Sequence, residues 1–242
     1  MITPQLNQIW VYLAATPLLG LTITLLAYQL AYLVYARSGF SPLANPVAMA
    51  VALLVAILWL THTPYSTYFS GAQFVHFLLG PATVALGVPL YLQWERLRRL
   101  ALPLLAGLAA GAVTAIGSGV ACAYLLGASR LTILSLAPKS VTTPIAMGIS
   151  EKIGGLPSLT AVLVILTGIS GAMMARPLLV GLLRIDAHWI RGFALGCAAH
   201  GIGTARAFQV SEEMGAFAGL AMGLNGLLTA AMTPLLIGLL AR

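Results

Sequence analysis

The stretch Ala198-Ala199-His200-Gly201-Ile202-Gly203-Thr204-Ala205-Arg206 interrupts a run of residues that is otherwise apolar enough to span a membrane. A histidine or an arginine inside a membrane span is costly, so it usually faces a protein cavity or the pathway of a polar solute. The glycines allow the helix to break, and broken backbone at membrane depth is tolerated where it lines a cavity. A weaker copy of the pattern lies in the first half of the chain, at Gly80-Pro81-Ala82-Thr83-Val84-Ala85. Two interrupted segments in corresponding halves predict the binding site of a secondary transporter.

The composition is that of a protein embedded in a bilayer. Of the 242 residues, 60% are hydrophobic and 7% are charged, and the mean hydropathy is +0.98. A soluble domain carries about a quarter charged residues, so we predict an all-α, polytopic transmembrane protein with a single membrane domain over residues 1–242. The formal net charge of +7 reflects basic loops between helices rather than a nucleic-acid partner. Cys122 and Cys197 lie in apolar runs, and no residue spacing predicts a metal site or a cofactor.

Seven stretches are apolar enough to be predicted membrane spans, each of which needs about 20 residues. They cover residues 9–36, 46–61, 72–93, 100–127, 156–175, 190–208 and 215–240. Glycines and prolines inside the third stretch predict two half-helices rather than one rod. Residues 130–150 start apolar and then carry two prolines among polar side chains, which predicts a broken or re-entrant element. The expected total is about seven to nine membrane segments.

Basic residues predict the orientation, because short loops rich in Lys and Arg stay in the cytoplasm. The most basic loop, residues 93–99, is expected inside, which places the N-terminus outside. The basic residues between positions 176 and 191 form a second loop that is expected inside. If residues 190–208 cross the membrane, Ser211-Glu212-Glu213 falls outside and the C-terminus is cytoplasmic.

The two halves of the chain share short motifs. Gly107-Leu108-Ala109-Ala110-Gly111 in the first half resembles Gly219-Leu220-Ala221-Met222-Gly223 in the second. With the orientation above, the segments that carry Gly80 and Gly201 run in opposite directions through the membrane. We therefore predict inverted-topology repeats over residues 1–127 and 128–242. This prediction needs an odd number of crossings in each repeat, and so it needs residues 130–150 to be irregular.

Polar side chains inside the predicted spans are candidate ligands for a solute. Arg206 could clamp a carboxylate through two hydrogen bonds, or it could snorkel to the membrane surface. His200 could donate to a substrate oxygen or carry a coupled proton, or a neighbouring carbonyl could satisfy it. Asn225 either faces the site or bridges two helices. The predicted substrate-binding residues are Gly80, Pro81, Thr83, Lys139, Ser140, Thr142, Thr143, His200, Gly201, Gly203, Thr204, Arg206 and Asn225, and the candidates for proton coupling are His200 and His76.

The small and hydroxyl-bearing residues have alternatives as well. Gly201 and Gly203 could turn backbone N–H groups toward an anion, or they could allow two helices to pack closely. The hydroxyls of Thr83 and Thr204 could bind a polar substrate, or each could bond a carbonyl of its own helix. Lys139 and the hydroxyls beside it could form a lining loop or gate, or a surface connection.

The residue inventory argues against an enzyme. The five acidic residues fall in loops or at the edge of an element, so no two carboxylates converge in the membrane for acid–base chemistry. No zinc-binding or nucleophile-elbow motif is present. The charges inside the predicted spans are cationic, which favours an anionic solute.

Several long motifs resemble the LrgB/CidB family of membrane proteins. They are Pro138-Lys139-Ser140-Val141-Thr142-Thr143-Pro144-Ile145-Ala146, Gly154-Gly155-Leu156-Pro157-Ser158-Leu159-Thr160-Ala161-Val162 and the opening stretch, with Gly80-Pro81-Ala82-Thr83-Val84-Ala85-Leu86 and Ala221-Met222-Gly223-Leu224-Asn225-Gly226 as further matches. The resemblance covers residues 45–236. One departure is Gly148, which stands where the family usually has an acidic or other polar residue.

The resemblance implies two alternative functions in a bacterial inner membrane. One is secondary transport of small monocarboxylates such as glycolate, glycerate, pyruvate or lactate, by an elevator or a rocking motion. The other is regulation of murein hydrolases and autolysis together with a small holin-like membrane protein of the LrgA/CidA type. The expected partners are therefore a carboxylate substrate, the lipid bilayer, the holin-like protein and, in a homo-oligomer, further copies of the chain.

Overall fold

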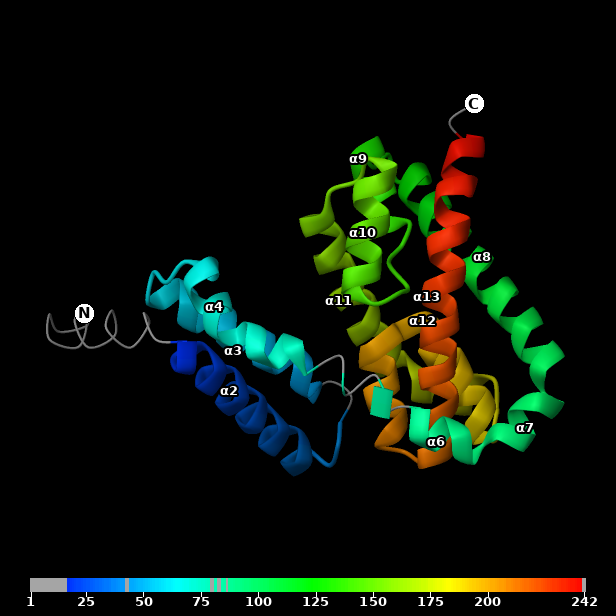
Figure 1. The fold of residues 1–242 in the computed structure, drawn as a ribbon, viewed down its shortest axis with the longest axis horizontal. Coiled ribbons are helices and arrows are strands. Elements are labelled where there is room, and N and C mark those ends of the chain that lie inside the picture. Colours follow the sequence, from blue (N-terminus) through cyan, green and yellow to red (C-terminus); the bar gives the residue numbers. More distant parts are fainter. Residues whose placement is uncertain (1–16, 42–43, 79–80, 82–83, 86, 241–242) are drawn as a thin grey trace, which may run out of the picture. The chain divides into compact units, whose positions relative to one another are not determined.

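The structure, a computed structural model, describes residues 17–41, 44–78, 81, 84–85 and 87–240 (Figure 1). All regular elements within these ranges are helices, which confirms the predicted all-α class for the described residues. The chain divides into two compact units, residues 1–85 and 86–242. Among the described residues, four helices are long and apolar enough to cross a membrane, and they are Leu18–Arg37, Ala101–Leu125, Pro157–Leu182 and Glu212–Gly238. The total of about seven to nine segments and the inverted repeats stay predictions.

The described part of the first unit includes the helices α2 (Pro17–Arg37), α3 (Pro46–Leu60) and α4 (Tyr65–Phe77). Asn45 begins α3, because its side chain accepts hydrogen bonds from the backbone N–H groups of Val47 and Ala48. These are donors that the start of a helix otherwise leaves open. The hydroxyls of Thr24 and Tyr68 lie 2.8 Å apart where α2 packs against α4.

The predicted third span, residues 72–93, is not one continuous helix. α4 starts earlier than expected and ends at Phe77. The next helix with described bounds is α6 (Gly87–Leu92), which belongs to the second unit and is followed by the basic helix α7 (Trp94–Arg99). An interruption in this region is what its glycines and prolines predict.

Three long helices frame the second unit. They are α8 (Ala101–Leu125), α11 (Pro157–Ala175), which continues into a π-helical stretch (Arg176–Leu182), and α13 (Glu212–Leu240). They confirm the apolar helices expected at residues 100–127, 156–175 and 215–240. Three of the four glycines of α8 lie against side chains of the same unit: Gly107 by Phe193, Gly111 by Cys197 and Gly119 by Lys139. These small residues therefore allow close packing within the chain.

A first hairpin covers residues 129–155 and contains α9 (Arg130–Leu136) and α10 (Thr143–Ile153). Its tip, residues 137–142, separates the two helices, and Pro144 suits the first turn of α10 because that position needs no N–H donor. The base of the hairpin meets the start of α11. Leu156 N–H donates to the Ser135 hydroxyl at 2.8 Å, and the hydroxyls of Thr160 and Ser150 lie 2.7 Å apart. The predicted broken element at residues 130–150 is thus confirmed.

The helix α12 (His188–Phe208) is a second hairpin rather than a straight rod. His200 in its middle has φ 41° and ψ −131°, which no helix allows. A non-glycine residue with such a positive φ is strained and persists only where its surroundings hold it. The chain turns at the His200-Gly201 position, inside the stretch that the sequence marks as a break.

Before the turn, α12 runs parallel to α13. Gly192 lies against Met214, and four residues later Gly196 lies against Ala218, so both chains advance in the same direction. A Cβ atom on either glycine would collide with the carbonyl oxygen of its neighbour. The two helix backbones therefore touch, and only glycine fits at these two positions.

After the turn, α12 runs antiparallel to α13. The Thr204 hydroxyl lies 3.8 Å from the Met222 sulfur, and the ring of Phe208 packs against Gly215. Residue numbers now rise in opposite directions along the two helices. The second half of α12 therefore leads back toward the end of the unit at which the first half began.

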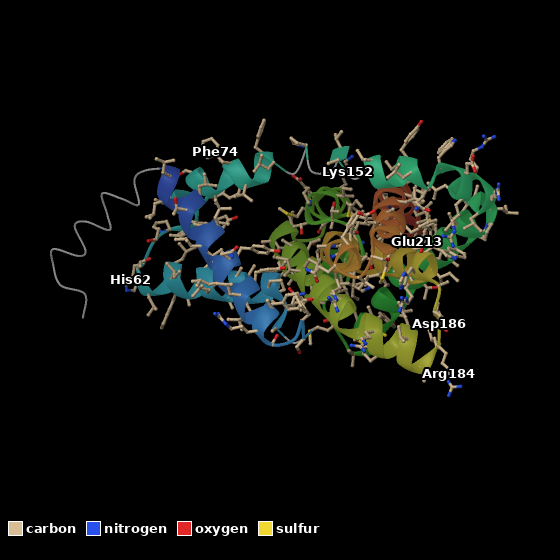
Figure 2. The ribbon with its side chains drawn as sticks, turned by 90° about the horizontal axis from the view of Figure 1, so that it is seen from below. His62, Phe74, Lys152, Arg184, Asp186 and Glu213 are labelled. Atoms are coloured by element: carbon tan, nitrogen blue, oxygen red, sulfur yellow. The ribbon has the colours of Figure 1, made fainter. Side chains whose placement is uncertain are left out.

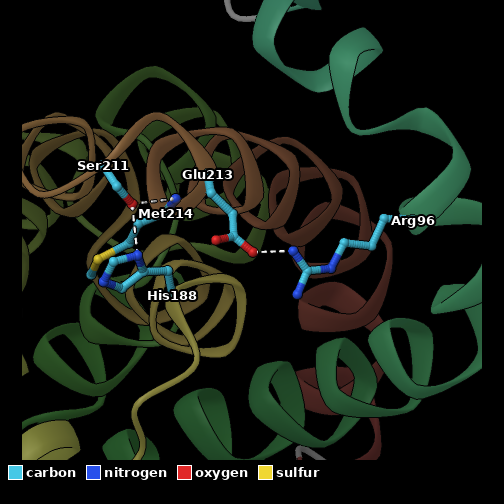
Figure 3. A network of polar contacts seen from close by, with 5 residues as sticks. All are labelled: Arg96, His188, Ser211, Glu213 and Met214. Carbon is cyan, nitrogen blue, oxygen red and sulfur yellow. Dashed lines mark hydrogen bonds and ion pairs between the residues drawn. The ribbon is translucent and has the colours of Figure 1, made fainter.

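This geometry shows that the predicted crossing by residues 190–208 is wrong. A span separates its two ends by the hydrocarbon thickness of about 30 Å, whereas His188 Nδ1 lies 3.3 Å from the Ser211 hydroxyl (Figure 3). Glu213, next to this contact, forms an ion pair with Arg96 of α7 (Figure 3). Residues 211–213, expected outside, thus lie at the same end as the basic loop 93–99, expected inside.

The reversal also changes the expected position of the C-terminal end. Basic residues gather at the end that holds α7, and Arg184 points away from the helices on the loop before α12 (Figure 2). The helix α13 starts at this end with Glu213 and runs to Leu240 at the other end. The positive-inside rule then places Leu240 outside, so the structure does not support the predicted cytoplasmic C-terminus.

A labelling experiment tests this arrangement. In a Cys122→Ala background, which removes the exposed native thiol, Glu212→Cys and Arg98→Cys should react with a membrane-impermeant maleimide from the same side of sealed vesicles. Leu126→Cys, at the far end of α8, should react from the opposite side. Labelling of Glu212→Cys and Arg98→Cys from different sides would restore the crossing by residues 190–208.

Candidate functional site

A cleft of about 700 Å³ lies between α8 and α11, and the tips of both hairpins reach it. One lysine and several hydroxyl-bearing residues form its polar lining, namely Thr114, Lys139, Ser140, Thr167 and Ser170. The other lining residues are apolar or glycine, and they are Ala110, Gly111, Ala115, Leu163, Leu166, Gly171 and Ala198. A concave, largely apolar site with a few polar groups is typical of small-molecule binding.

Lys139 supplies the charge of this cleft. Its Nζ donates toward the Ala115 carbonyl oxygen at 3.4 Å and toward the Ser140 hydroxyl at 3.3 Å. Gly119 on α8 makes room for the side chain, because a Cβ there would lie 3.0 Å from Lys139 Cε. Among the described residues no carboxylate pairs with Lys139. The ammonium group is therefore available to an anion that enters the cleft.

Asn225 of α13 joins the two hairpins. Its Nδ2 donates to the Ser140 carbonyl at 3.1 Å in the first tip and to the Cys197 carbonyl at 2.9 Å beside the second. The side chain is only 1% exposed and does not line the cleft. Of the two alternatives for Asn225, the geometry matches a bridge between elements.

His200 and Thr204 also bond within the protein. His200 Nε2 lies 2.9 Å from the Val164 carbonyl oxygen of α11, which fixes the proton on that nitrogen because a carbonyl can only accept. The Thr204 hydroxyl donates to the His200 carbonyl oxygen at 2.8 Å. Both side chains are buried and neither lines the cleft. Their contacts hold the turn of α12 against α11.

Arg206 and the glycines of α12 lie away from the cleft lining. The Arg206 guanidinium donates to the Gln209 side chain at 3.1 Å, near the base of the second hairpin. Gly203 packs against Leu195 and Ala199 in the first half of the same hairpin. Gly203 therefore serves close packing, whereas a Cβ at Gly201 would make only an ordinary contact with the Met222 sulfur, at 3.9 Å.

The remaining predicted site residues are only partly described. Thr142 and Thr143 are half-buried at the start of α10 and do not line the cleft. Pro81 is exposed, and His76 is described only as part of the backbone of α4. Gly80 and Thr83 lie outside the described residues, so their predicted role stays a prediction.

The sequence reasoning overlooked three cleft residues, Thr114, Thr167 and Ser170. Each sits in an otherwise apolar helix, where a single hydroxyl is readily taken as bonding its own helix, as Thr167 does to Leu163 at 2.8 Å. The spacing of these residues along their helices is the sequence signal that could have identified them. Thr167 and Ser170 lie three residues apart on one face of α11, and Thr114 lies between Gly111 and Ala115, which also line the cleft.

The packing of His200 leads to a stability prediction. A Cβ at Gly168 would lie 2.7 Å from His200 Cε1 and 2.9 Å from Nε2. Gly168→Ala should therefore displace the ring from Val164 and lower the free energy of unfolding by about 1–3 kcal/mol, measured as denaturation in detergent. Gly148→Ala is the matched control, because Gly148 is helical and has open space around it. Equal stability of the two variants would show that the His200 ring moves aside without lowering the free energy of unfolding.

Comparison with known proteins identifies the family. The chain matches the LrgB-like family over residues 24–239. It is 38% identical over 220 residues to the Bacillus subtilis protein YwbG, covering 91% of this chain and 97% of that one. It is 35% identical over 226 residues to YxaC of the same organism, with 93% and 97% covered, and 29% identical over 220 residues to the antiholin-like protein LrgB of Bacillus mycoides, with 91% and 95% covered. No solved structure matches. With a family match over most of its length, the chain belongs to the LrgB-like family of membrane proteins.

Proposed function

We propose that the chain is a secondary transporter of small monocarboxylates across the bacterial inner membrane. One observation carries the proposal: the ammonium group of Lys139 sits in a cleft of about 700 Å³ with no acidic partner among the described residues. A carboxylate would balance this charge through charge-assisted hydrogen bonds. The hydroxyls of Thr114, Thr167 and Ser170 on the cleft walls suit the 2-hydroxy or 2-oxo oxygen of such an acid.

The two hairpins support a moving site. Their bases lie near opposite ends of α13, and their tips meet at Asn225 near the middle of that helix. Transporters place substrate sites where discontinuous helices meet at mid-membrane, and alternating access moves such a core against a scaffold. The predicted inverted repeats belong to this proposal, as do Gly80 and Thr83 as a second contribution to the site.

The names of relatives favour a second candidate function. The Bacillus mycoides relative is named an antiholin-like protein, which suggests that this chain regulates lysis of the cell wall together with a small holin-like membrane partner. A regulatory subunit needs an interaction surface, but it has no need of a lysine in a cleft. This candidate predicts that activity depends on the partner and that the purified chain carries no solute.

Transport by the purified chain separates the two candidates. Proteoliposomes that hold this chain alone are given radiolabelled glycolate, lactate or pyruvate under an imposed proton gradient. Saturable uptake above empty liposomes supports the transporter. Absence of uptake, from protein that shows cooperative unfolding, together with restored flux or altered lysis when the holin-like partner is added, supports the regulatory subunit.

A further inference from the structure

We infer that the preferred substrates carry an apolar tail next to the carboxylate, so that two-carbon and three-carbon acids fill only the polar end of the site. This inference rests on the proposed function. Its basis is a second, apolar groove that lies beside the cleft and extends toward the basic end of the unit.

The groove adjoins the cleft. A groove of about 440 Å³ runs between α8 and the first half of α12, and it shares Gly111, Ala115 and Ala198 with the cleft that holds Lys139. Clefts of about 300–1,000 Å³ accommodate drug-sized ligands. A molecule as small as glycolate would leave most of this space unfilled.

The walls of the groove are almost entirely apolar. Pro103 and Leu104 of α8 line it together with Trp189, Ile190 and Phe193 of α12, and Leu104 and Phe193 also pack in one buried cluster. From Ala115 to Pro103 the groove follows α8 for about 18 Å, at about 1.5 Å per helical residue. The cation therefore stands at one end of an elongated apolar slot, which matches a carboxylate with a branched or aromatic side chain.

The width of the groove depends on glycine. Gly107 lines the groove but not the cleft, and a Cβ there would lie 3.8 Å from Phe193 Cε1, an ordinary contact. Alanine therefore fits at this position, whereas the longer side chain of leucine would occupy the groove. Gly117 lies on the same helix with open space around it, so Gly117→Leu adds the same side chain without filling the slot.

Equilibrium binding to the full chain in nanodiscs tests the inference without depending on flux. The probes are lactate, 2-hydroxybutyrate, 2-hydroxy-4-methylpentanoate and 3-phenyllactate, measured by titration calorimetry. Each methylene that enters the groove should tighten binding by roughly threefold to fourfold. Gly107→Leu should weaken binding of 3-phenyllactate by about tenfold or more, which corresponds to about two lost methylenes, and should leave lactate unchanged. Gly117→Leu should change neither.

The outcomes separate this inference from the function on which it rests. Affinity that is flat or falls with tail length, while lactate binds and is taken up, overturns the apolar tail and leaves the transporter intact. The same result is expected if bilayer lipid occupies the groove. Equal weakening of lactate and 3-phenyllactate by Gly107→Leu also overturns the inference. If no acid of the series binds, both the inference and the proposed substrate class fail.

Discussion

Replacing Lys139 with methionine should abolish most saturable carboxylate uptake while leaving the protein folded. A hydrogen bond that involves a charged group contributes about 1.5–3 kcal/mol, so loss of the ammonium group should raise the KM for a monocarboxylate by about tenfold to a hundredfold. The same change removes a charge from the membrane interior, where lysine is costly. Thermal stability should therefore stay constant or rise, and uptake kinetics in proteoliposomes together with thermal unfolding measure both effects.

The other lysine of the chain provides the matched control. Lys152 is exposed in the last turn of α10, at the base of the first hairpin, and Lys152→Met should leave both the KM and the stability unchanged. A second variant, Gly119→Ala, keeps the charge but places a Cβ 3.0 Å from Lys139 Cε, so that the lysine side chain must shift. It should raise the KM by less than Lys139→Met. Normal uptake by Lys139→Met, combined with lower stability, would identify Lys139 as a structural group that bonds the Ala115 carbonyl.

The elements that were predictable from sequence are those whose signal is local. Long apolar runs predicted α8, α11 and α13, because about 20 apolar residues in succession match the length of one helical crossing of the hydrocarbon core. The prolines and polar residues between positions 138 and 144 predicted the first hairpin tip, because such a stretch cannot face lipid as a helix. Lys139 and Ser140 were predicted as candidate site residues from the same stretch.

The second hairpin was not predicted, because it depends on contacts between residues far apart in the sequence. Residues 190–208 are long enough to span, and the prediction counted them as one crossing, although α12 is not among the described helices that are apolar enough to cross a membrane. The decisive information is the contact of Gly192 with Met214 and of His188 with Ser211, which join residues far apart in sequence. Because this one element was predicted as a crossing, residues 211–213 were predicted on the wrong side of the membrane. The predicted side of the C-terminus depended on the same crossing.

The roles of the candidate ligands depend on partners that the sequence does not give. A polar side chain inside an apolar run must find a partner, but the sequence does not say whether the partner is a solute or the protein. His200, Thr204 and Asn225 find carbonyl groups of the protein. Lys139 is different, because its contacts leave its charge uncompensated among the described residues, and this property makes it the proposed binding group.

The other large effect is expected at Asn225. Asn225→Leu has a similar volume but removes the amide that donates to the Ser140 and Cys197 carbonyls at 3.1 Å and 2.9 Å. Each buried acceptor left without a partner costs about 1–3 kcal/mol, so the free energy of unfolding should fall by about 2–5 kcal/mol. Because this amide holds both tips in place, uptake at a temperature where the variant is still folded should also fall, through kcat more than through KM.

Two further substitutions on the same helix separate the loss of the bridge from a general loss of packing. Asn225→Asp should be more damaging than Asn225→Leu at neutral pH, because an ionised carboxylate would face two carbonyl oxygens. The stability of Asn225→Asp should recover as the pH falls, because a protonated carboxyl can donate to one of the two carbonyl oxygens.

Thr233 lies two turns further along α13, where its buried hydroxyl has no partner among the described residues. Thr233→Val should raise the free energy of unfolding by up to about 1 kcal/mol, because it removes an unsatisfied polar group. If Asn225→Leu unfolds at the same temperature as the wild type, the amide does not hold the hairpins, and the two tips are positioned by the apolar packing of α12 on α13 alone.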